Sequence, residues 1–447
     1  MTTTGIRGHL SFALSNAAAV GDGTVTTPTP TEHSPDGDGW WTQPFTAATL
    51  AVNEFAEMLP QELGATLFTR GGYKSGAFMA GSASMEVRLH KYFGKILQAM
   101  AAQGVPTQTV ARAATTFGTT GTIGVLPDRT LVLAADPTTN AAVAGDVLLI
   151  ESEKLLVLKV NSATNYTVAR GYDGTAAIAH SAKAVTHVIK DAFTMFAPEP
   201  GNEQKTPFVH VRRYVPDTAG TGGYTEYGFD GKAISLSLAI PQMGAAKAEF
   251  GVVLRRPYGY GSEDFTPAAS ASAIPGMTET PLSLALSCTS NLALPLMTIT
   301  GPTDASFMGA QVQLVNGAIP PQDGMVVGSY HPEDFTILSR GGTIRMAYKW
   351  KDEALYNAVV YGGDMGNWSP TIKYSDVVIS MVAASNATNF PYRLDLVFPN
   401  VALTMSAPTL VAGRFVMTEL TGAITYDSVT GYPWMAFLRN GATYNGE

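Results

Sequence analysis

Alternating apolar and small polar residues recur along the chain and predict β-strands, because successive side chains of an extended strand point to opposite faces. Residues 234–250 read "ISLSLAIPQMGAAKAEF", with Leu236 and Leu238 on one face, followed by a proline and a corner of small residues. Residues 401–417 read "VALTMSAPTLVAGRFVM" and match the first segment without a gap, so that Leu236 aligns with Leu403. The chain therefore carries one strand-and-corner pattern twice.

Three further pairs of segments match in the same order along the chain. The pairs are "LSFALS" at 10–15 with "LSLALS" at 282–287, "LP" at 59–60 with "IP" at 319–320, and "AGSASMEVR" at 80–88 with "RGGTIRMAY" at 340–348. Each match is short, but four matches in one order predict a duplicated domain.

The strands predicted at 80–88 and 340–348 are each followed by a segment with the period of an amphipathic helix, at residues 90–104 and 351–363. The apolar stripes are Phe93, Ile96, Leu97 and Met100 in the first segment and Ala354, Leu355, Ala358 and Val359 in the second. Gly104 and Gly362 are expected to end these helices, because glycine commonly follows the last helical turn. The sequence thus predicts one short helix in each half.

The spacing between matched segments is unequal and indicates an insertion in the first half. Residues 107–195 contain several short strands separated by turn residues, as expected of a small independent β module. A module inserted at a loop is tolerated when its two ends lie close together. The predicted division is a first domain of residues 1–106 and 196–262, an inserted β domain of 107–195, and a second domain of 263–447.

The composition favours the same architecture. The 447 residues are enough for two or three domains, each with its own core. Charged residues make up 14% of the chain, below the usual quarter, whereas Gly (45) and Pro (27) are plentiful. We therefore expect a mainly β fold with two short helices, built from two tandem β-sandwich domains plus an inserted small β domain. The low charge suggests that much of the surface contacts other protein.

Charge, cysteine count and hydropathy exclude several classes of protein. The net charge of −8 argues against a dedicated nucleic-acid binder, which would cluster Lys and Arg. The single cysteine, Cys288, excludes an internal disulfide framework and is expected to be a small buried hydrophobe. No window of 18 apolar residues predicts a membrane span, and the N-terminus alternates like a strand. We expect a soluble protein made in a cytoplasm.

The motifs of phosphate, dinucleotide, metalloprotease and serine-hydrolase sites are absent from the sequence. "FGTTGTIG" at 117–124 lacks the lysine of a phosphate cradle, so a turn or linker is expected there. Asp36 and Asp38 before Gly39 lack the other ligands of a calcium loop, so a plain turn is expected. The histidines are scattered and predict no metal site; they are His9, His33, His90, His180, His187, His210 and His331.

The remaining polar candidates have simpler interpretations. Glu333–Asp334 and the pair Glu151 and Glu153 are the best carboxylates for acid–base work, but no nucleophile accompanies them and a solvated surface is expected. Trp40 and Trp41 could bind a sugar, although packing against a sheet is favoured. The paired arginines of 211–214 ("VRRY") and 254–257 ("LRRP") are expected to form ion pairs or interface contacts. We predict no enzyme, with no catalytic, metal or cofactor-binding residues.

Taken together, these segments resemble the major tail tube protein of long-tailed (siphovirus-type) bacteriophages, in a duplicated form. The resemblance rests on the N-terminal strand and its following arm, on "LAVNEFAEMLPQELG" at 50–64, on "GSASMEVRL" feeding "HKYFGKILQAM" at 81–100, and on "GFDGKAISLSLAIPQMGAAKAEFGVVL" at 228–254. The insertion, 107–195, is similar to small β modules of phage structural proteins. It lies outside the matched region and would be a decoration on the outer surface.

The resemblance implies a virion protein, assembled in the host cytoplasm, whose sheets join edge to edge around a lumen. Two domains per chain imply homotrimeric rings that imitate six-fold symmetry and stack into a tube. Its partners would be other copies of itself, the tape measure protein and DNA inside the lumen, and further tail proteins at the tube ends. Long loops at 17–38 and 263–280 would reach the next ring.

Two other kinds of protein fit part of the pattern. A tail adhesin or carbohydrate-binding β protein would use Trp40, Trp41 and the inserted module. A capsid or tail-terminator structural protein would form a single ring or a lattice rather than a tube. Discrete oligomers with glycan affinity would indicate the first, and hollow tubes would exclude both.

Overall fold

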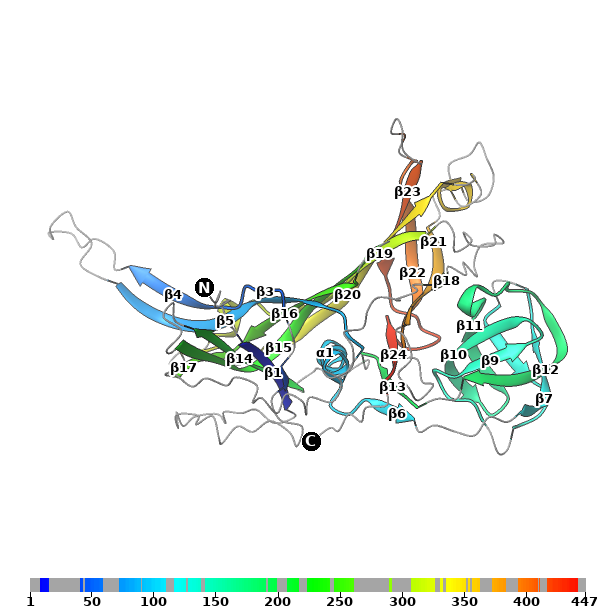
Figure 1. The fold of residues 1–447 in the computed structure, drawn as a ribbon, viewed down its shortest axis with the longest axis horizontal. Helices are drawn as coiled ribbons and strands as arrows, with labels where there is room; N and C mark the ends of the chain where they lie inside the picture. The colour runs from blue at the N-terminus through cyan, green and yellow to red at the C-terminus, as the bar shows by residue number, and fades with distance from the viewer. Residues whose placement is uncertain are drawn as a thin grey trace, which may run out of the picture.

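The computed structural model shows a mainly β protein. The residues it describes are 9–15, 41–42, 45–58, 72–89, 91–109, 116–125, 128–137, 141–189, 192–198, 207–216, 223–241, 245–260, 289–291, 307–325, 330–332, 335–350, 353, 356–361, 372–382, 393–408, 410 and 416–440. Figure 1 shows a long twisted sheet, a helix beneath it and a separate barrel at one side.

The first half forms two layers that share one long strand. Its elements are β1 (His9–Ser15), β2 (Trp41–Thr42), β3 (Ala47–Ala48), β4 (Ala51–Met58), β5 (Gly72–Glu86), α1 (Lys91–Ala101), β14 (Phe208–Pro216), β15 (Gly223–Ile240), β16 (Lys247–Leu254) and β17 (Arg256–Tyr260). The first part of β15 pairs with β14 and β17, whereas its second part pairs with β16. Asp230, with φ of 55°, lies where the strand passes from one layer to the other.

The second half repeats this order of strand neighbours. Its elements are β18 (Thr289–Asn291), β19 (Phe307–Ala318), η4 (Pro321–Gly324), β20 (Ile337–Lys349), η5 (Asn357–Tyr361), β21 (Lys373–Val382), β22 (Arg393–Met405), β23 (Met417–Ile424) and β24 (Met435–Arg439). The series β4–β5–β16–β15 in the first half has its counterpart in β19–β20–β23–β22. Likewise, β15 with β14 and β17 corresponds to β22 with β21 and β24. We call the two sets of strands the first and second repeat.

The two repeats join through backbone pairing into one continuous antiparallel sheet. The second part of β15 pairs with β19 from Ser235 opposite Val315 to Ile240 opposite Ala310. The sheet therefore runs without a break from β4 to β22 (Figure 1). Leu236 and Leu238 are fully buried in its core, as the alternation predicted, whereas Ile234 lies at a register shift and is only half-buried.

The predicted first helix is confirmed as α1, and its apolar stripe is buried in the main core. The helix ends earlier than expected, because Ala102 rather than Gly104 takes the left-handed conformation, with φ of 51°. The Ala102 amide donates to the Ala99 carbonyl, and the Gln103 amide to the Gln98 carbonyl. These two bonds satisfy the last carbonyls in a Schellman motif. In the second predicted segment, the described residues include the π-helical turn η5.

A closed six-stranded barrel occupies residues 116–189, within the range predicted for the insertion. Its strands are β7 (Thr116–Ile123), β8 (Thr130–Leu133), β9 (Val147–Ile150), β10 (Glu153–Ser162), β11 (Asn165–Ala169) and β12 (His180–Ile189). The turn expected at 117–124 is therefore wrong: this segment is β7. A Cβ at Gly121 would lie 2.8 Å from Val185 Cγ2, so this glycine lets the barrel wall close against its own core.

Two short strands connect the barrel to the first repeat: β6 (Thr107–Thr109) leads into it and β13 (Phe193–Phe196) leads out of it. These two strands pair with each other. β13 then pairs with β24, the last strand of the second repeat. The insertion interrupts the first repeat in sequence, yet both of its connections extend the sheet of the second.

Candidate functional site

The face of the joined sheet that points away from the core carries small and polar side chains. One line of paired positions crosses eight strands and illustrates this composition: Ala47, Ser84, Glu249, Ser237, Gln313, Thr343, Ala423 and Ala402. All eight are exposed or half-buried. Such a face fits a water-filled space better than a protein core.

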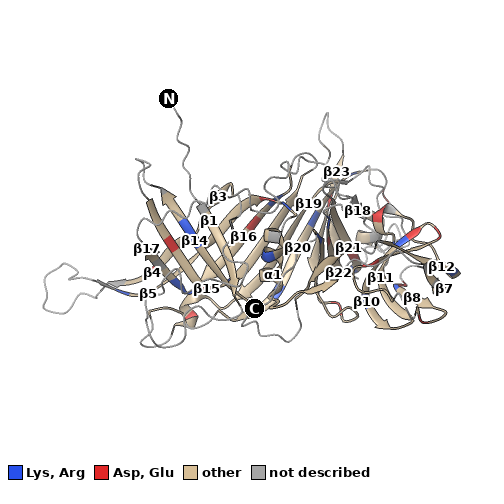
Figure 2. Cartoon of the chain, turned by 60° about the horizontal axis from the view of Figure 1, so that its bottom comes forward, with Lys and Arg blue, Asp and Glu red and all other residues tan. Residues whose placement is uncertain are grey.

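Charges on this face are few and of both signs. Glu249 accepts a hydrogen bond from the Ser82 hydroxyl at 2.6 Å, and Arg345 lies 3.9 Å from Glu419. Figure 2 shows the strands of the joined sheet mostly free of charged residues, with isolated blue and red positions. Among the described residues of this face, positive and negative side chains are interspersed, so no single sign of charge dominates it.

The two ends of the joined sheet are edge strands. The pairings of β3 and β4, which follow each other along this edge, are to β5 alone within the described residues. At the other end, the pairings of β22 beyond Leu403 in the described part of the chain are to β23 alone. Unpaired strand edges are templates for pairing with another strand, so these two edges are the places where a further sheet can attach.

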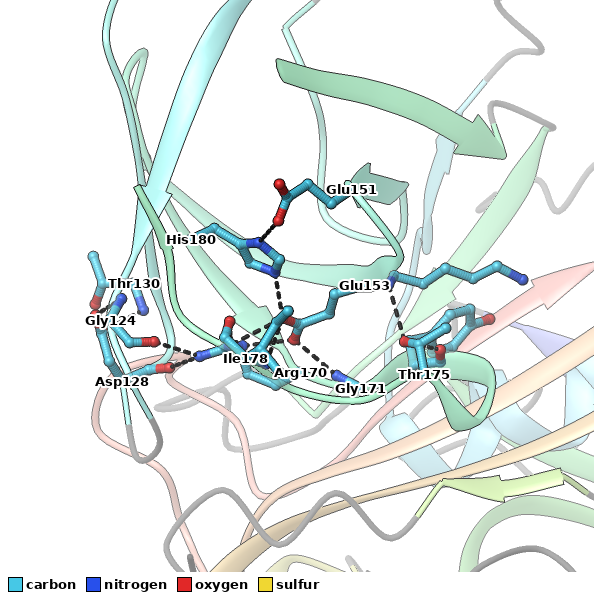
Figure 3. A network of polar contacts seen from close by, with 12 residues as sticks. Gly124, Asp128, Thr130, Glu151, Glu153, Arg170, Gly171, Thr175, Ile178 and His180 are labelled. Atoms are coloured by element: carbon cyan, nitrogen blue, oxygen red, sulfur yellow. Dashed lines mark hydrogen bonds and ion pairs between the residues drawn. The ribbon is translucent and has the colours of Figure 1, made fainter. Parts of the chain in front are cut away.

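A buried polar network closes one end of the barrel and is the densest group of charged side chains there (Figure 3). Arg170 donates from Nε and Nη2 to the two carboxylate oxygens of Glu153, at 2.7 and 2.9 Å, and both side chains are fully buried. The backbone amides of Gly171 and Ile178 also donate to Glu153, at 3.2 and 3.1 Å. His180 Nε2 lies 2.9 Å from the same carboxylate.

The rest of this network ties loop backbone to the barrel wall. Arg170 Nη1 donates to the carbonyls of Gly124 and Asp128, and Nη2 donates to that of Ile178. Every nitrogen of the guanidinium therefore has an acceptor, and the Glu153 carboxylate is saturated with donors. A carboxylate in this state has no free position for a substrate proton, so the arrangement holds the barrel together rather than performing acid–base chemistry.

The solvated surface expected for Glu151 and Glu153 is right for the first and wrong for the second. Glu151 is exposed, and its pKa is lowered by hydrogen bonds from Lys183 and His180. The partners of Glu153 come from later segments: Arg170 follows β11, which pairs with β10 as a hairpin, and His180 begins β12, on the far side of β9. No sequence motif marks these contacts, because they join Glu153 to residues 17 and 27 positions further along the chain.

The other predicted candidates show no common site. Arg213 forms an ion pair with Glu226, as expected of the paired arginines, and Arg255 donates to the Pro332 carbonyl at 2.6 Å. His187 Nε2 lies 3.5 Å from Asp146, and His331 Nδ1 lies 3.1 Å from the Ala77 carbonyl. Among the described residues, no group of three or more His, Cys, Asp or Glu could hold a metal ion.

Several predictions fall on residues outside the described part. They concern His33, His90, Asp36, Asp38, Gly39, Trp40, Cys288, Glu333, Asp334, "LSLALS" at 282–287 and the loops at 17–38 and 263–280. The backbone of Trp41 lies in β2, opposite Phe12. No helix in the described ranges is long and apolar enough to cross a membrane.

The sequence did not reveal a second charged cluster, located between the barrel and the second repeat. Asp395 is fully buried and accepts from Arg393 Nε at 2.9 Å, Arg439 Nη1 at 2.6 Å and the Ser380 hydroxyl at 2.6 Å. Burial alone would raise the pKa of Asp395, but the two guanidinium groups and the Ser380 hydrogen bond lower it below its usual range. Arg393 and Asp395 alternate with apolar residues in "RLDLVF", a pattern typical of a buried strand with internal charge pairs.

Comparison with known proteins adds no family. No protein-family model matches the chain, and no curated protein matches it.

Proposed function

We propose that this protein is the structural subunit of a hollow tube, a phage tail tube that conducts DNA during ejection. The joint between β15 and β19 is the observation that carries the proposal, because it pairs one repeat with the next, edge to edge. Pairing the free edges of separate chains in the same way would remove both edges and close a ring. Two repeats per chain then suit a homotrimeric ring with pseudo-six-fold symmetry.

The register of the joint between chains follows from the internal one. In the first repeat, one row of paired residues crosses four neighbouring strands in the order Ala48, Ala83, Phe250 and Leu236. In the second repeat, the corresponding row is Val312, Ile344, Gly422 and Leu403. Leu236 is therefore equivalent to Leu403, and Ala48 to Val312.

Within the chain, Leu238 pairs with Val312 and Ala239 with Gln311. The equivalent pairs between neighbouring chains are Met405 with Ala48 and Ser406 with Ala47. Side chains keep the correct faces in this register, since Ser406 and Ala47 are exposed, whereas Met405 and Ala48 pack against the core. Residues 373–375 of β21 already pair with 401–403, so the joint would begin beyond Leu403.

The polar face of the joined sheet would line the lumen. Its small side chains and mixed charges leave DNA and a tape measure protein free to slide, since binding to DNA is dominated by contacts of Lys and Arg with phosphate. Other tail proteins would meet the tube at its ends. The protein would then act in the virion tail after assembly in the host cytoplasm, without a catalytic step.

Disulfide cross-linking tests the register directly. In a chain with Cys288→Ser, the variant Ala47→Cys/Ser406→Cys should form disulfide-linked chains on oxidation, because facing residues of antiparallel strands have Cβ atoms about 4.5–5.5 Å apart. The matched control is Ala47→Cys/Ala423→Cys, since Ala423 lies on the same face but one strand away from the edge. Cross-linking equal to that of the control would refute the proposed joint.

Negative-stain microscopy of the purified protein at high concentration tests the assembly. Hollow tubes with three chains per ring are expected. Persistent monomers with affinity for glycans would instead indicate an adhesin or carbohydrate-binding protein, and isolated rings or lattices would indicate a terminator or capsid protein.

A further inference from the structure

The barrel is attached to the second repeat through a buried apolar cluster. Three parts of the chain contribute to it. They are the barrel (Val147, Leu156, Leu158, Ala169 and Tyr172), the segment that leaves the barrel through β13 (Phe193, Met195 and Ala197), and the second repeat (Val378, Val397, Met435 and Phe437). This cluster is separate from the interior of the barrel, which contains Leu155 and Val157 from the same strand β10. The barrel thus has one core of its own and a second core that it shares with β21, β22 and β24.

The strand β13 connects this shared core to the main core, to which α1 and both repeats contribute. Phe193 and Met195 belong to the shared cluster, whereas Phe196 is buried in the main core together with Phe93 of α1. The Ala197 amide donates to the Gln103 side chain, just after α1, at 3.2 Å. A four-residue strand therefore packs against both repeats at once.

Ion pairs and hydrogen bonds lock the same interface. Arg393 Nη2 lies 2.7 Å from Asp173 in the short 3-10 turn η1 (Tyr172–Gly174) that comes after β11, and the Arg393 guanidinium sits over the Tyr172 ring at 4.6 Å. Arg439 Nη2 donates to the Gly145 carbonyl at 2.6 Å. Both arginines also bind Asp395, so the contacts of the barrel are built on a buried charge cluster of the second repeat.

A second set of polar contacts lies away from this cluster. Arg129 Nη1 donates to the Pro399 carbonyl at 3.2 Å, and Lys159 Nζ donates to the Val429 carbonyl at 2.6 Å. Contacts at several separated places restrict rotation as well as translation of the barrel against the second repeat. The barrel has its own core, as expected of a small β module, and it is also held firmly against the second repeat.

We infer that the barrel is a brace that sets the angle between the two repeats. Apart from the chain itself, the repeats are also joined by the β15–β19 pairing, by the main buried core to which both contribute, and by hydrogen bonds such as those of Asn316 to the Met100 and Ala233 carbonyls and of Arg255 to the Pro332 carbonyl. Strand pairing alone leaves a wide range of twist between neighbouring strands. The insertion adds a further connection, through β13, that lies away from the β15–β19 joint, and this connection limits the twist at the joint. This inference concerns a single chain and does not depend on tube formation.

Distances between spin labels on the two repeats test the brace in the full chain. Lys74 on β5 and Arg345 on β20 are suitable label sites, with side chains 68% and 62% exposed, in a Cys288→Ser background. The brace is removed by Leu156→Asp/Leu158→Asp, which places two charges in the shared cluster. The matched control is Val160→Asp on the same strand, where Val160 is 40% exposed.

The control should give one narrow distance distribution, and the double variant one at least twice as wide. Hydrogen exchange on the same samples should show that β24 loses protection while β9 and β12 keep theirs. A distribution that stays narrow after β24 loses its protection would overturn the inference. Unfolding of the barrel itself in the double variant also removes the brace, so the distance distribution decides the question in that case as well. Arg129→Ala/Lys159→Ala is a milder second variant, for which intermediate broadening is expected.

Discussion

Asp376 is a buried charge whose replacement should change the stability of this protein in a pH-dependent way. It lies in β21 at a register shift, is 3% exposed, and both of its carboxylate oxygens lack a hydrogen-bond partner within the described structure. Burial raises its pKa to about 6, against the attraction of Arg129 from the barrel and with the repulsion of Asp427. Asp376→Asn keeps the shape of the side chain and removes the charge.

The size of the effect follows from the difference in pKa between the folded and unfolded states. Asp376 ionises near 3.8 in the unfolded chain and near 6 in the folded one. The folded state therefore holds its proton more tightly, and stability is lost as the pH rises from about 4 to about 6. Each unit of pKa difference corresponds to about 1.4 kcal/mol, so above pH 6 the ionised Asp376 lowers the free energy of unfolding by about 3 kcal/mol. Asp376→Asn should raise the free energy of unfolding by up to that amount at pH 7.5 and by little at pH 3.5.

Urea unfolding followed by the fluorescence of tryptophan, including the buried Trp434, measures the effect across this pH range. The difference in the free energy of unfolding between wild type and variant at each pH isolates the contribution of Asp376, because the other titrating groups are common to both. Asp323→Asn in the exposed turn η4 is the control and should show no such pH dependence. A constant difference between wild type and Asp376→Asn from pH 4 to 7.5 would refute the reasoning.

Two further substitutions test the barrel and the helix end. Glu153→Gln should destabilise the barrel by about 3 kcal/mol or more, because it leaves the buried Arg170 uncompensated. Hydrogen exchange at β10 and β11 measures this loss, and the exposed Glu151→Gln is a nearly silent control. Equal effects of the two variants would contradict the structural role assigned to Glu153. Ala102→Gly should stabilise the chain by about 1 kcal/mol, because glycine adopts the left-handed conformation without the cost of a Cβ. A lower urea midpoint for Ala102→Gly would show that Ala102 does not hold that conformation in solution.

Local periodicity was enough to predict the elements that depend on one face of a strand or helix. The stripe of α1 is buried as predicted, because residues three and four apart share one side of a helix. The alignment of Leu236 with Leu403 holds in three dimensions, since each residue occupies the same position in the order of paired strands. The helix end was misplaced because Ala102 adopts a conformation that sequence signals assign to glycine.

Contacts between distant segments could be decided only by the tertiary structure. Glu153 reads as a surface residue until the pairing of β9, β10, β11 and β12 brings Arg170 and His180 to it, and a buried charge is stable only with such partners. The insertion reads as a separate module, but its outer residues Leu156 and Leu158 find apolar partners on the second repeat. By itself, the sequence determined the alternating strands, the first helix and the order of the repeated segments, because these follow from local patterns. It missed strand β7, and its match of 80–88 with 340–348 is one residue out of register, since Ala83 occupies the position of Ile344. The joined sheet and the position of the barrel depend on which surfaces meet, and that depends on the whole fold.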